Sequence, residues 1–150
     1  MATSDRRTAF MESHRYPGLL DSLSPIRRRV GRAATEAGLG EREAYKLCLA
    51  VDEIATNIIT HGYEEAGLEG DILVRIDRDD QTLTVYLEDS GLPYDPLAMP
   101  LPDDLEAPLQ ERHAGGLGIF LAVQSVDSFH YEKVDKLNRH VLVMNRPRAS

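Results

Sequence analysis

Disulfide-forming cysteines, zinc-binding patterns and long apolar runs are absent from this 150-residue sequence. Its single cysteine, Cys48, cannot form an internal disulfide, and a lone thiol in an apolar stretch fits the reducing cytoplasm. No apolar run approaches the length of a membrane-spanning helix, and no apolar signal-peptide core follows the charged N-terminus. The five histidines lack the spacing of zinc ligands. We therefore expect a cytoplasmic protein with no zinc site and no membrane contact.

Basic residues are also outnumbered, with 17 Lys and Arg against 25 Asp and Glu and a formal net charge of −8. Such a chain repels the phosphate backbone, which argues against a nucleic-acid partner. Its 150 residues, 42% of them hydrophobic, are enough for one well-formed core and too few for two full domains. We expect one domain that spans residues 1–150.

The hydrophobic pattern predicts two long helices, one from about residue 21 or 24 to 37 and one from about 41 to 61. Their buried faces are expected to carry Ile26, Val30, Ala33 and Ala34 in the first, and Leu47, Val51, Ile54 and Ile58 in the second. Strands are expected at 8–14, 70–77, 82–87, 128–133 and 140–145, the last two joined as a hairpin around 134–138. This order favours an α+β fold, a two-layer α/β sandwich with helices on one face of a mostly antiparallel, mixed sheet.

The second helix carries a carboxylate and a carboxamide one turn apart. Glu53 and Asn57 stand at i and i+4, so both project from the same face of the helix. Glu can accept a proton, and Asn can offer a neutral oxygen to a hard cation such as magnesium. By itself the pair is weak evidence, because Glu and Asn at this spacing are common on solvated helices.

A second motif follows the strand expected at 82–87. Asp89 and Gly91 lie where the chain must turn, in the run Asp89-Ser90-Gly91-Leu92-Pro93. A buried carboxylate here could accept a hydrogen bond from an amino group on a flat heterocycle, and the glycine would let the ligand approach the backbone. An ordinary Asp-Ser-Gly turn is the alternative.

A third motif is a glycine cluster, Gly115-Gly116-Leu117-Gly118, at the start of an apolar helix expected at about 117–126. Free backbone N–H groups at a helix N-terminus attract anions, and glycines let a phosphate reach them. The cluster is neither a Walker A sequence nor a dinucleotide-binding fingerprint. A flexible hinge is the alternative.

The three motifs in this order resemble the Bergerat-fold ATPases, which include sensor histidine kinases, type II topoisomerases and heat-shock chaperones. The resemblance is strongest to the anti-sigma-factor serine/threonine kinases of bacterial partner-switching systems. It covers residues 8–146 and rests on three boxes: Ala50–Asn57 with His61-Gly62-Tyr63, Asp89–Pro96, and Gly115–Leu121.

The resemblance implies roles in binding ATP and Mg²⁺. Glu53 would be the general base, and Asn57 would ligate the magnesium that bridges the ATP phosphates. Asp89 would hydrogen-bond the adenine amino group, with Gly91 keeping the backbone close to the base.

The third box would hold the phosphates. Gly116 and Gly118, in the box that also includes Gly115 and Leu117, would offer N–H groups to them beneath an ATP lid at about 97–114. Arg112, near the end of that lid, would meet the γ-phosphate.

Two features depart from the family pattern. Many members carry a threonine on the last strand that helps to fix the adenine, and Val141 stands where that threonine is expected. The lid sets four acids against one arginine: Asp103, Asp104, Glu106 and Glu111.

The expected function is therefore an ATP-dependent serine/threonine kinase that binds a sigma factor or other effector and phosphorylates a small antagonist protein. The resemblance also implies a homodimer, with the N-terminal strand and first helix contributing, and an antagonist that docks over the lid. Two alternatives stay open. One is a partner-binding module, nucleotide-responsive or nucleotide-free, that transfers no phosphate. The other is a detached ATPase portion that acts on a histidine supplied in trans.

Overall fold

The computed structural model describes residues 10–93 and 116–147. Its helical elements are the 3₁₀ turn η2 (Leu20–Ser22), α1 (Leu23–Glu36), α2 (Glu41–Asn57), the π-helix η3 (Ile58–Glu64) and α3 (Gly116–Gln124). Its strands are β1 (Phe10–Pro17), β2 (Asp71–Arg78), β3 (Thr82–Asp89), β4 (Ser128–Val134) and β5 (Leu137–Asn145). No helix within the described residues combines the length and the hydrophobicity needed to cross a membrane.

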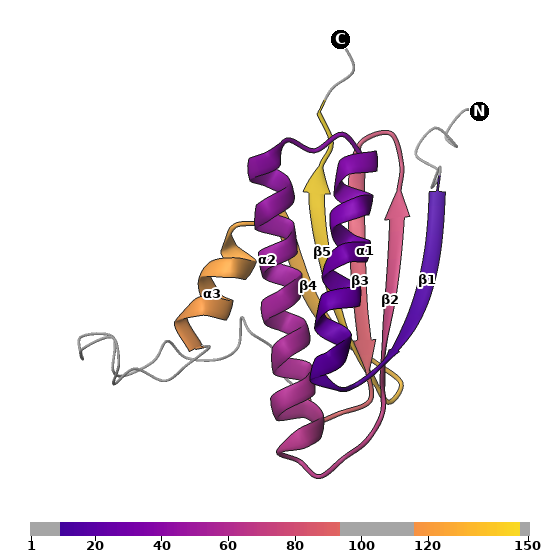
Figure 1. The fold of residues 1–150 in the computed structure, drawn as a ribbon, viewed down its shortest axis with the longest axis vertical. Coiled ribbons are helices and arrows are strands. Elements are labelled where there is room, and N and C mark those ends of the chain that lie inside the picture. The colour runs from indigo at the N-terminus through magenta and orange to yellow at the C-terminus, as the bar shows by residue number, and fades with distance from the viewer. Residues whose placement is uncertain (1–9, 94–115, 148–150) are drawn as a thin grey trace.

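The five strands form one sheet in the order β1-β2-β3-β5-β4, and each of these four pairings is antiparallel. The helices lie on one face of this sheet, with α1 and α2 side by side and α3 beside α2 (Figure 1). The predicted α+β sandwich is thereby confirmed. Because strand residues alternate between the two faces, every second side chain of β3 and β5 points into the helix-covered core.

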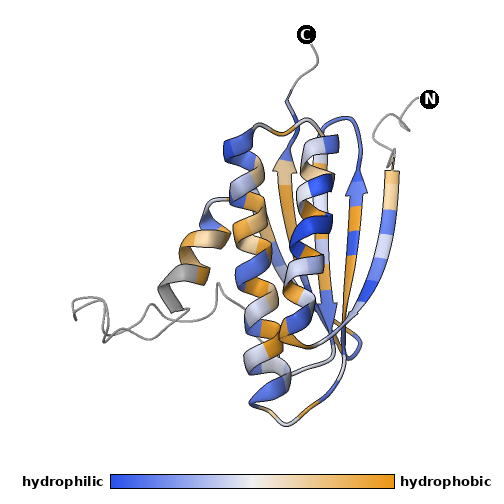
Figure 2. Ribbon diagram, viewed as in Figure 1, coloured by the Kyte–Doolittle hydropathy of each residue, from blue (hydrophilic) through white to orange (hydrophobic). Residues whose placement is uncertain are grey.

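The core confirms the helical faces expected from the sequence. Ile26, Val30, Ala33 and Ala34 of α1 are buried, as are Leu47, Val51, Ile54 and Ile58 of the second helix. Figure 2 shows both long helices banded with hydrophilic and hydrophobic residues, the pattern of helices that cover a core on one side only.

The second long helix ends differently from the prediction. Regular α-helix stops at Asn57, and residues 58–64 continue as a π-helix. The wider winding continues into the following turn, where the N–H of Glu65 bonds the carbonyl of Thr60 at 2.9 Å and that of Leu68 bonds the carbonyl of Tyr63 at 2.9 Å. Both bonds span five residues, and such segments are frequent at functional sites.

The last hairpin is also longer than predicted. β5 begins at Leu137 rather than at residue 140, so only Asp135 and Lys136 separate it from β4. Asp135 takes a positive φ of 57°, which suits the tight turn and which aspartate tolerates better than most residues. The earlier start brings Asn138 into the sheet.

Tyr63 joins η3 to two strand ends. Its ring fills the space between Gly18 and Gly70, where an added Cβ would come within 2.6 Å and 2.7 Å of the ring. Its hydroxyl donates to the carbonyl of Asp71 at 2.7 Å and accepts from the N–H of Ser90 at 2.9 Å. One side chain thus ties the start of β2 to the turn that follows β3.

We expect Tyr63→Phe to lower the free energy of unfolding by about 1–3 kcal/mol, because it leaves the Ser90 N–H and the Asp71 carbonyl without their partner. Urea denaturation measures the change. Tyr45→Phe is the matched control, since Tyr45 is 68% exposed and should lose little. Equal stabilities for the two variants would contradict the bridging role.

Candidate functional site

Asp89 lies buried at the end of β3, with 3% of its surface exposed. Its Oδ1 accepts hydrogen bonds from the N–H of Gly91 at 2.8 Å and from Nδ2 of Asn138 at 3.0 Å. Its Oδ2 is also buried, and no donor among the described residues reaches it. Buried polar atoms without partners are rare, so this oxygen is a candidate acceptor for a ligand.

Burial raises the pKa of the Asp89 carboxyl. The hydrogen bonds from Asn138 and Gly91 oppose this rise, as do smaller electrostatic effects of His140 and Lys133. A carboxylate in such surroundings gains from any N–H donor that enters. The geometry therefore fits the contact with an amino group that the sequence predicts for Asp89.

Gly91 packs directly against the backbone of η3. A Cβ at this position would lie 2.6 Å from the carbonyl oxygen of Gly62, and the N–H of Leu92 donates to that same oxygen at 3.0 Å. Among the described residues, this contact between two backbones explains why position 91 is a glycine. The closeness of Gly91 to an adenine base stays a prediction. The contact places the turn after β3 against the C-terminal end of the helix that carries Glu53 and Asn57.

Asn57 is held by its own helix. It is 6% exposed, and its Nδ2 donates to the carbonyl of Glu53 at 2.8 Å. This bond directs the amide nitrogen to the backbone and leaves Oδ1 as the atom that can act as a ligand. A neutral oxygen in a fixed position fits one ligand of a magnesium ion, which usually keeps water and phosphate oxygens as its others.

No group of three or more His, Cys, Asp or Glu side chains that could hold a metal occurs within the described ranges. Asn57 alone would not retain a cation. The residues present therefore fit an ion that arrives with a polyphosphate better than one bound permanently.

Glu53 lies one turn before Asn57 and is half-buried. Burial, with a smaller effect from the neighbouring Asp52 carboxylate, raises the pKa of Glu53. Asp52 itself pairs with Arg27 of α1 at 2.8 Å. A higher pKa makes Glu53 a stronger base, which suits the role predicted for it.

The glycine box opens α3, close to the helix start predicted from the sequence. Gly116, Leu117 and Gly118 form its first turn, and α3 packs against α2. Gly115, Arg112 and the predicted lid at 97–114 lie outside the described residues, and the predicted phosphate contacts stay predictions.

The last strand corrects one expectation. Val141 pairs with Tyr86 on the face away from the helices, so it does not stand beside Asp89. Asn138, directly opposite Asp89, and His140, opposite Leu87, face the helix-covered side. The placement of Val141 in the adenine site was wrong because it ignored the alternation of the strand.

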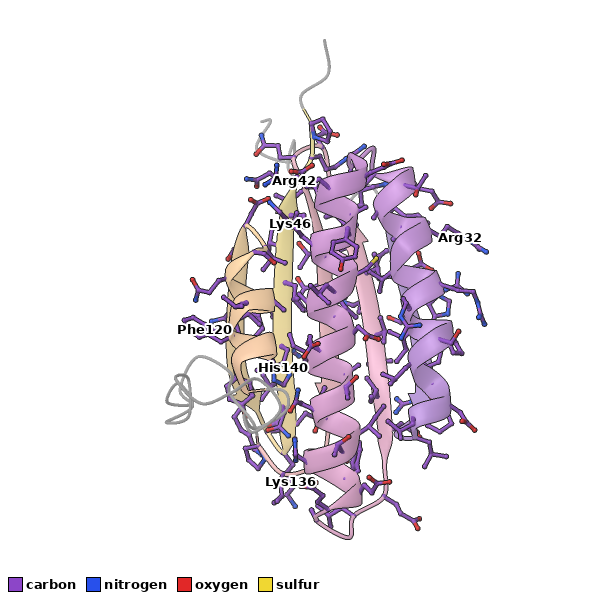
Figure 3. All side chains as sticks on the ribbon, turned by 60° about the vertical axis from the view of Figure 1, so that its left-hand side comes forward. Arg32, Arg42, Lys46, Phe120, Lys136 and His140 are labelled. Atoms are coloured by element: carbon purple, nitrogen blue, oxygen red, sulfur yellow. The ribbon has the colours of Figure 1, made fainter. Side chains whose placement is uncertain are left out.

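Asn138 and His140 are site residues that the sequence reasoning missed. Both are 1% exposed, and His140 lies against the rings of Phe129 and Tyr131, with centroids 6.1 Å and 5.0 Å away. In Figure 3, His140 on β5 is seen between α2 and α3. Two polar residues at alternate positions before the apolar Leu142 were the signal available in the sequence.

An apolar pocket of about 600 Å³ is lined in part by Tyr63 and lies between η2 and the loop before β2. It is lined by Leu19, Leu20 and Leu68, among others. Its lining contains no buried polar side-chain atom that lacks a partner. The open acceptor on Asp89 therefore makes the end of β3 the better candidate for a polar ligand.

We expect Asp89→Asn to be more stable to unfolding than the wild type at pH 8. Because the pKa of Asp89 is raised in the folded protein, ionisation of Asp89 costs stability as the pH rises through that pKa. The advantage of the neutral amide should vanish at pH values below the ordinary aspartate range. Thermal melting from about pH 2.5 to 8 measures it, with Asp80→Asn in the exposed turn as the control. A melting difference that does not change with pH would contradict the raised pKa.

Comparisons with known proteins bear on the family and the fold. A family model described as "Histidine kinase-like ATPase domain" matches residues 16–145. The crystal structure of the RsbU and RsbW domains of Rv1364c from Mycobacterium tuberculosis is similar, with a TM-score of 0.62 and 15% identity over 93% of this chain and 34% of that chain. The present chain thus spans about a third of that one. The histidine kinase domain of the blue-light activated histidine kinase EL346 from Erythrobacter litoralis aligns with a TM-score of 0.47 and 16% identity, over 81% of this chain and 60% of that chain.

No curated protein matches the chain. The family model nevertheless covers well over half of it, including α2 with Glu53 and Asn57 and the turn after Asp89. The chain belongs to the histidine kinase-like ATPase domain family.

Proposed function

We propose that this chain is an ATP-dependent serine/threonine protein kinase that acts as an anti-sigma factor or other partner-switching regulator. The observation that carries the proposal is the buried Asp89 carboxylate, with one acceptor oxygen left open beside the helix that bears Glu53 and Asn57. Family membership implies ATP binding. Transfer of the phosphate to a protein goes beyond family membership and is the further step of this proposal.

In this proposal Asp89 would hold the base and the start of α3 the phosphates. Oδ2 of Asp89 would accept the adenine amino hydrogen, and Oδ1 of Asn57 would ligate the magnesium that accompanies ATP. The ion supplies charge neutralisation for the phosphates. The N–H groups of Gly116 and Gly118 at the start of α3 bind phosphate oxygens.

Glu53 is the general base of the proposed reaction. A serine or threonine hydroxyl of the partner attacks the γ-phosphorus, its proton passes to the Glu53 carboxylate, and the bond to the β,γ-bridging oxygen breaks. The products are a phosphorylated hydroxyl and ADP. Burial and Asp52 raise the pKa of Glu53, which improves proton acceptance near neutral pH.

The partners follow from the same proposal. The substrate would be a small antagonist protein that docks over residues 97–114, with Arg112, Gly115 and Leu117 near the phosphates. A sigma factor or other effector would bind a cytoplasmic homodimer. The fold shared with a structure that contains an RsbW domain is consistent with partner switching.

Of the two departures from the family pattern, the one at Val141 does not favour the alternative of a module that transfers no phosphate. Val141 faces away from the site, and Asn138 and His140 give the last strand a polar lining there. Glu53 is retained.

Calorimetric titration with ATP and Mg²⁺, then with ADP, tests the nucleotide site. Saturable binding that is lost in Asp89→Asn supports it. No heat at high ATP, together with an unchanged melting temperature, would overturn it and favour the module without nucleotide.

We expect Glu53→Gln to bind ATP as the wild type does and to transfer phosphate at least 100-fold more slowly, because it removes a base and no nucleotide contact. γ-Labelled ATP and a cell extract provide the assay. Acid-stable label on a small protein indicates phosphoserine or phosphothreonine, whereas acid-labile label indicates a histidine supplied in trans. Glu41→Gln, at the exposed start of α2, is the control and should be fully active. Transfer by Glu53→Gln at the wild-type rate would contradict the assignment.

A further inference from the structure

Asn138 occupies an unusual position for a residue of a hairpin strand. It is 1% exposed and lies directly opposite Asp89 in the pairing of β3 with β5. Its Nδ2 donates to Oδ1 of Asp89 at 3.0 Å and to the carbonyl of Gly91 at 3.0 Å. These acceptors are 49 and 47 residues away along the chain. The amide therefore acts on the candidate site and not only on its own hairpin.

The other end of the Asn138 amide is fixed as well. Its Oδ1 accepts from the hydroxyl of Tyr131 at 2.8 Å and from Nζ of Lys133 at 3.4 Å. Both hydrogens of the nitrogen and both lone pairs of the oxygen are thereby used. An amide with all four bonds made has one orientation, because a flip would set its oxygen against the acceptors of Asp89 and Gly91 and its nitrogen against the Lys133 ammonium.

This fixed amide makes the two oxygens of Asp89 unequal. Oδ1 already accepts from Gly91 and from Asn138, so it is closed to a ligand. Oδ2 is buried and receives no donor from the described part of the chain. The carboxylate therefore presents one acceptor instead of two.

We propose that Asn138 is a positioning residue that closes one oxygen of Asp89 and so limits the site to a base with a single amino donor, selecting adenine over guanine. The inference rests on the proposed nucleotide site. Adenine offers one exocyclic amino group beside a ring acceptor. Guanine offers two adjacent donors, N1–H and the 2-amino group, which together match both oxygens of a free carboxylate. A carboxylate with Oδ1 closed can satisfy the first base and leaves a donor of the second unpaired.

The test compares ATP and GTP affinities of the wild type and of Asn138→Ala by calorimetry with Mg²⁺. We expect the preference for ATP over GTP to fall about tenfold in Asn138→Ala, the scale of one lost hydrogen bond at a discriminating site. Asn145→Ala is the matched control, because it makes the same change at the exposed end of the same strand. A folded Asn138→Ala that keeps the wild-type preference, even with both affinities reduced, would overturn the selection.

Asn138→Asp covers the case in which the alanine variant does not fold. It is nearly isosteric and replaces the donor with an acceptor that faces Asp89, with Lys133, Tyr131 and His140 around it. We expect ATP binding to be weaker than in the wild type at pH 8 and to recover as the pH falls, when a shared proton restores one hydrogen bond. Binding by this variant that is as tight as the wild type at pH 8 would overturn the positioning role.

A readout without nucleotide separates this inference from the proposed function. The titration of the Asp89 carboxyl carbon by NMR should move to higher pH in Asn138→Ala and stay in place in Asn145→Ala, since the bond from Asn138 lowers the pKa of Asp89. A wild type that binds neither nucleotide would overturn the proposed function and the selection. An unchanged Asp89 titration would overturn the positioning by Asn138.

Discussion

Burial of the Asp89 carboxylate at the end of β3 is the constraint around which the rest of the site is arranged. A buried carboxylate is costly unless hydrogen bonds offset its lost hydration. The two donors to Oδ1 come from different places, Gly91 just after the strand and Asn138 on β5. Gly91 can reach that position because it lies flush against Gly62 of η3, and the change from α-helix to π-helix occurs in that segment. Helix, turn and sheet thus meet at one ionisable group.

The same burial that costs stability prepares the chemistry. Burial raises the pKa of both Asp89, at the end of β3, and Glu53, on α2. Carboxyl groups with a raised pKa and an open acceptor are typical of functional sites rather than of cores optimised for stability. Asn57 belongs to this pattern, because its own helix backbone fixes its amide and leaves the oxygen available. Asp89 and Asn57 are thus both held by hydrogen bonds before any ligand arrives.

Much of this arrangement could be predicted from the sequence, and the exceptions have physical reasons. Helical periodicity predicted the buried faces of α1 and α2, because burial of one stripe leaves a direct pattern in the residue types. The π-helix left no such pattern, since its wider winding does not change which residue types are buried; its Gly62 contacts Gly91, a residue distant in sequence. Asn138 was missed because its partner Asp89 lies 49 residues away in sequence, and only the register of β3 with β5 brings them together.

That register is held on both faces of the sheet. Asp89 meets Asn138 on the helix-covered face, and the adjacent pair, Glu88 and Arg139, forms an ion pair on the open face. Arg139 also bonds Glu132 of β4 at 3.0 Å, which extends the pairing to the edge strand. A slip of one residue would turn the ion pair into the core and the amide outward, so both faces oppose it. The orientation of a single carboxylate oxygen in the site therefore depends on an ionic contact on the opposite face of the sheet.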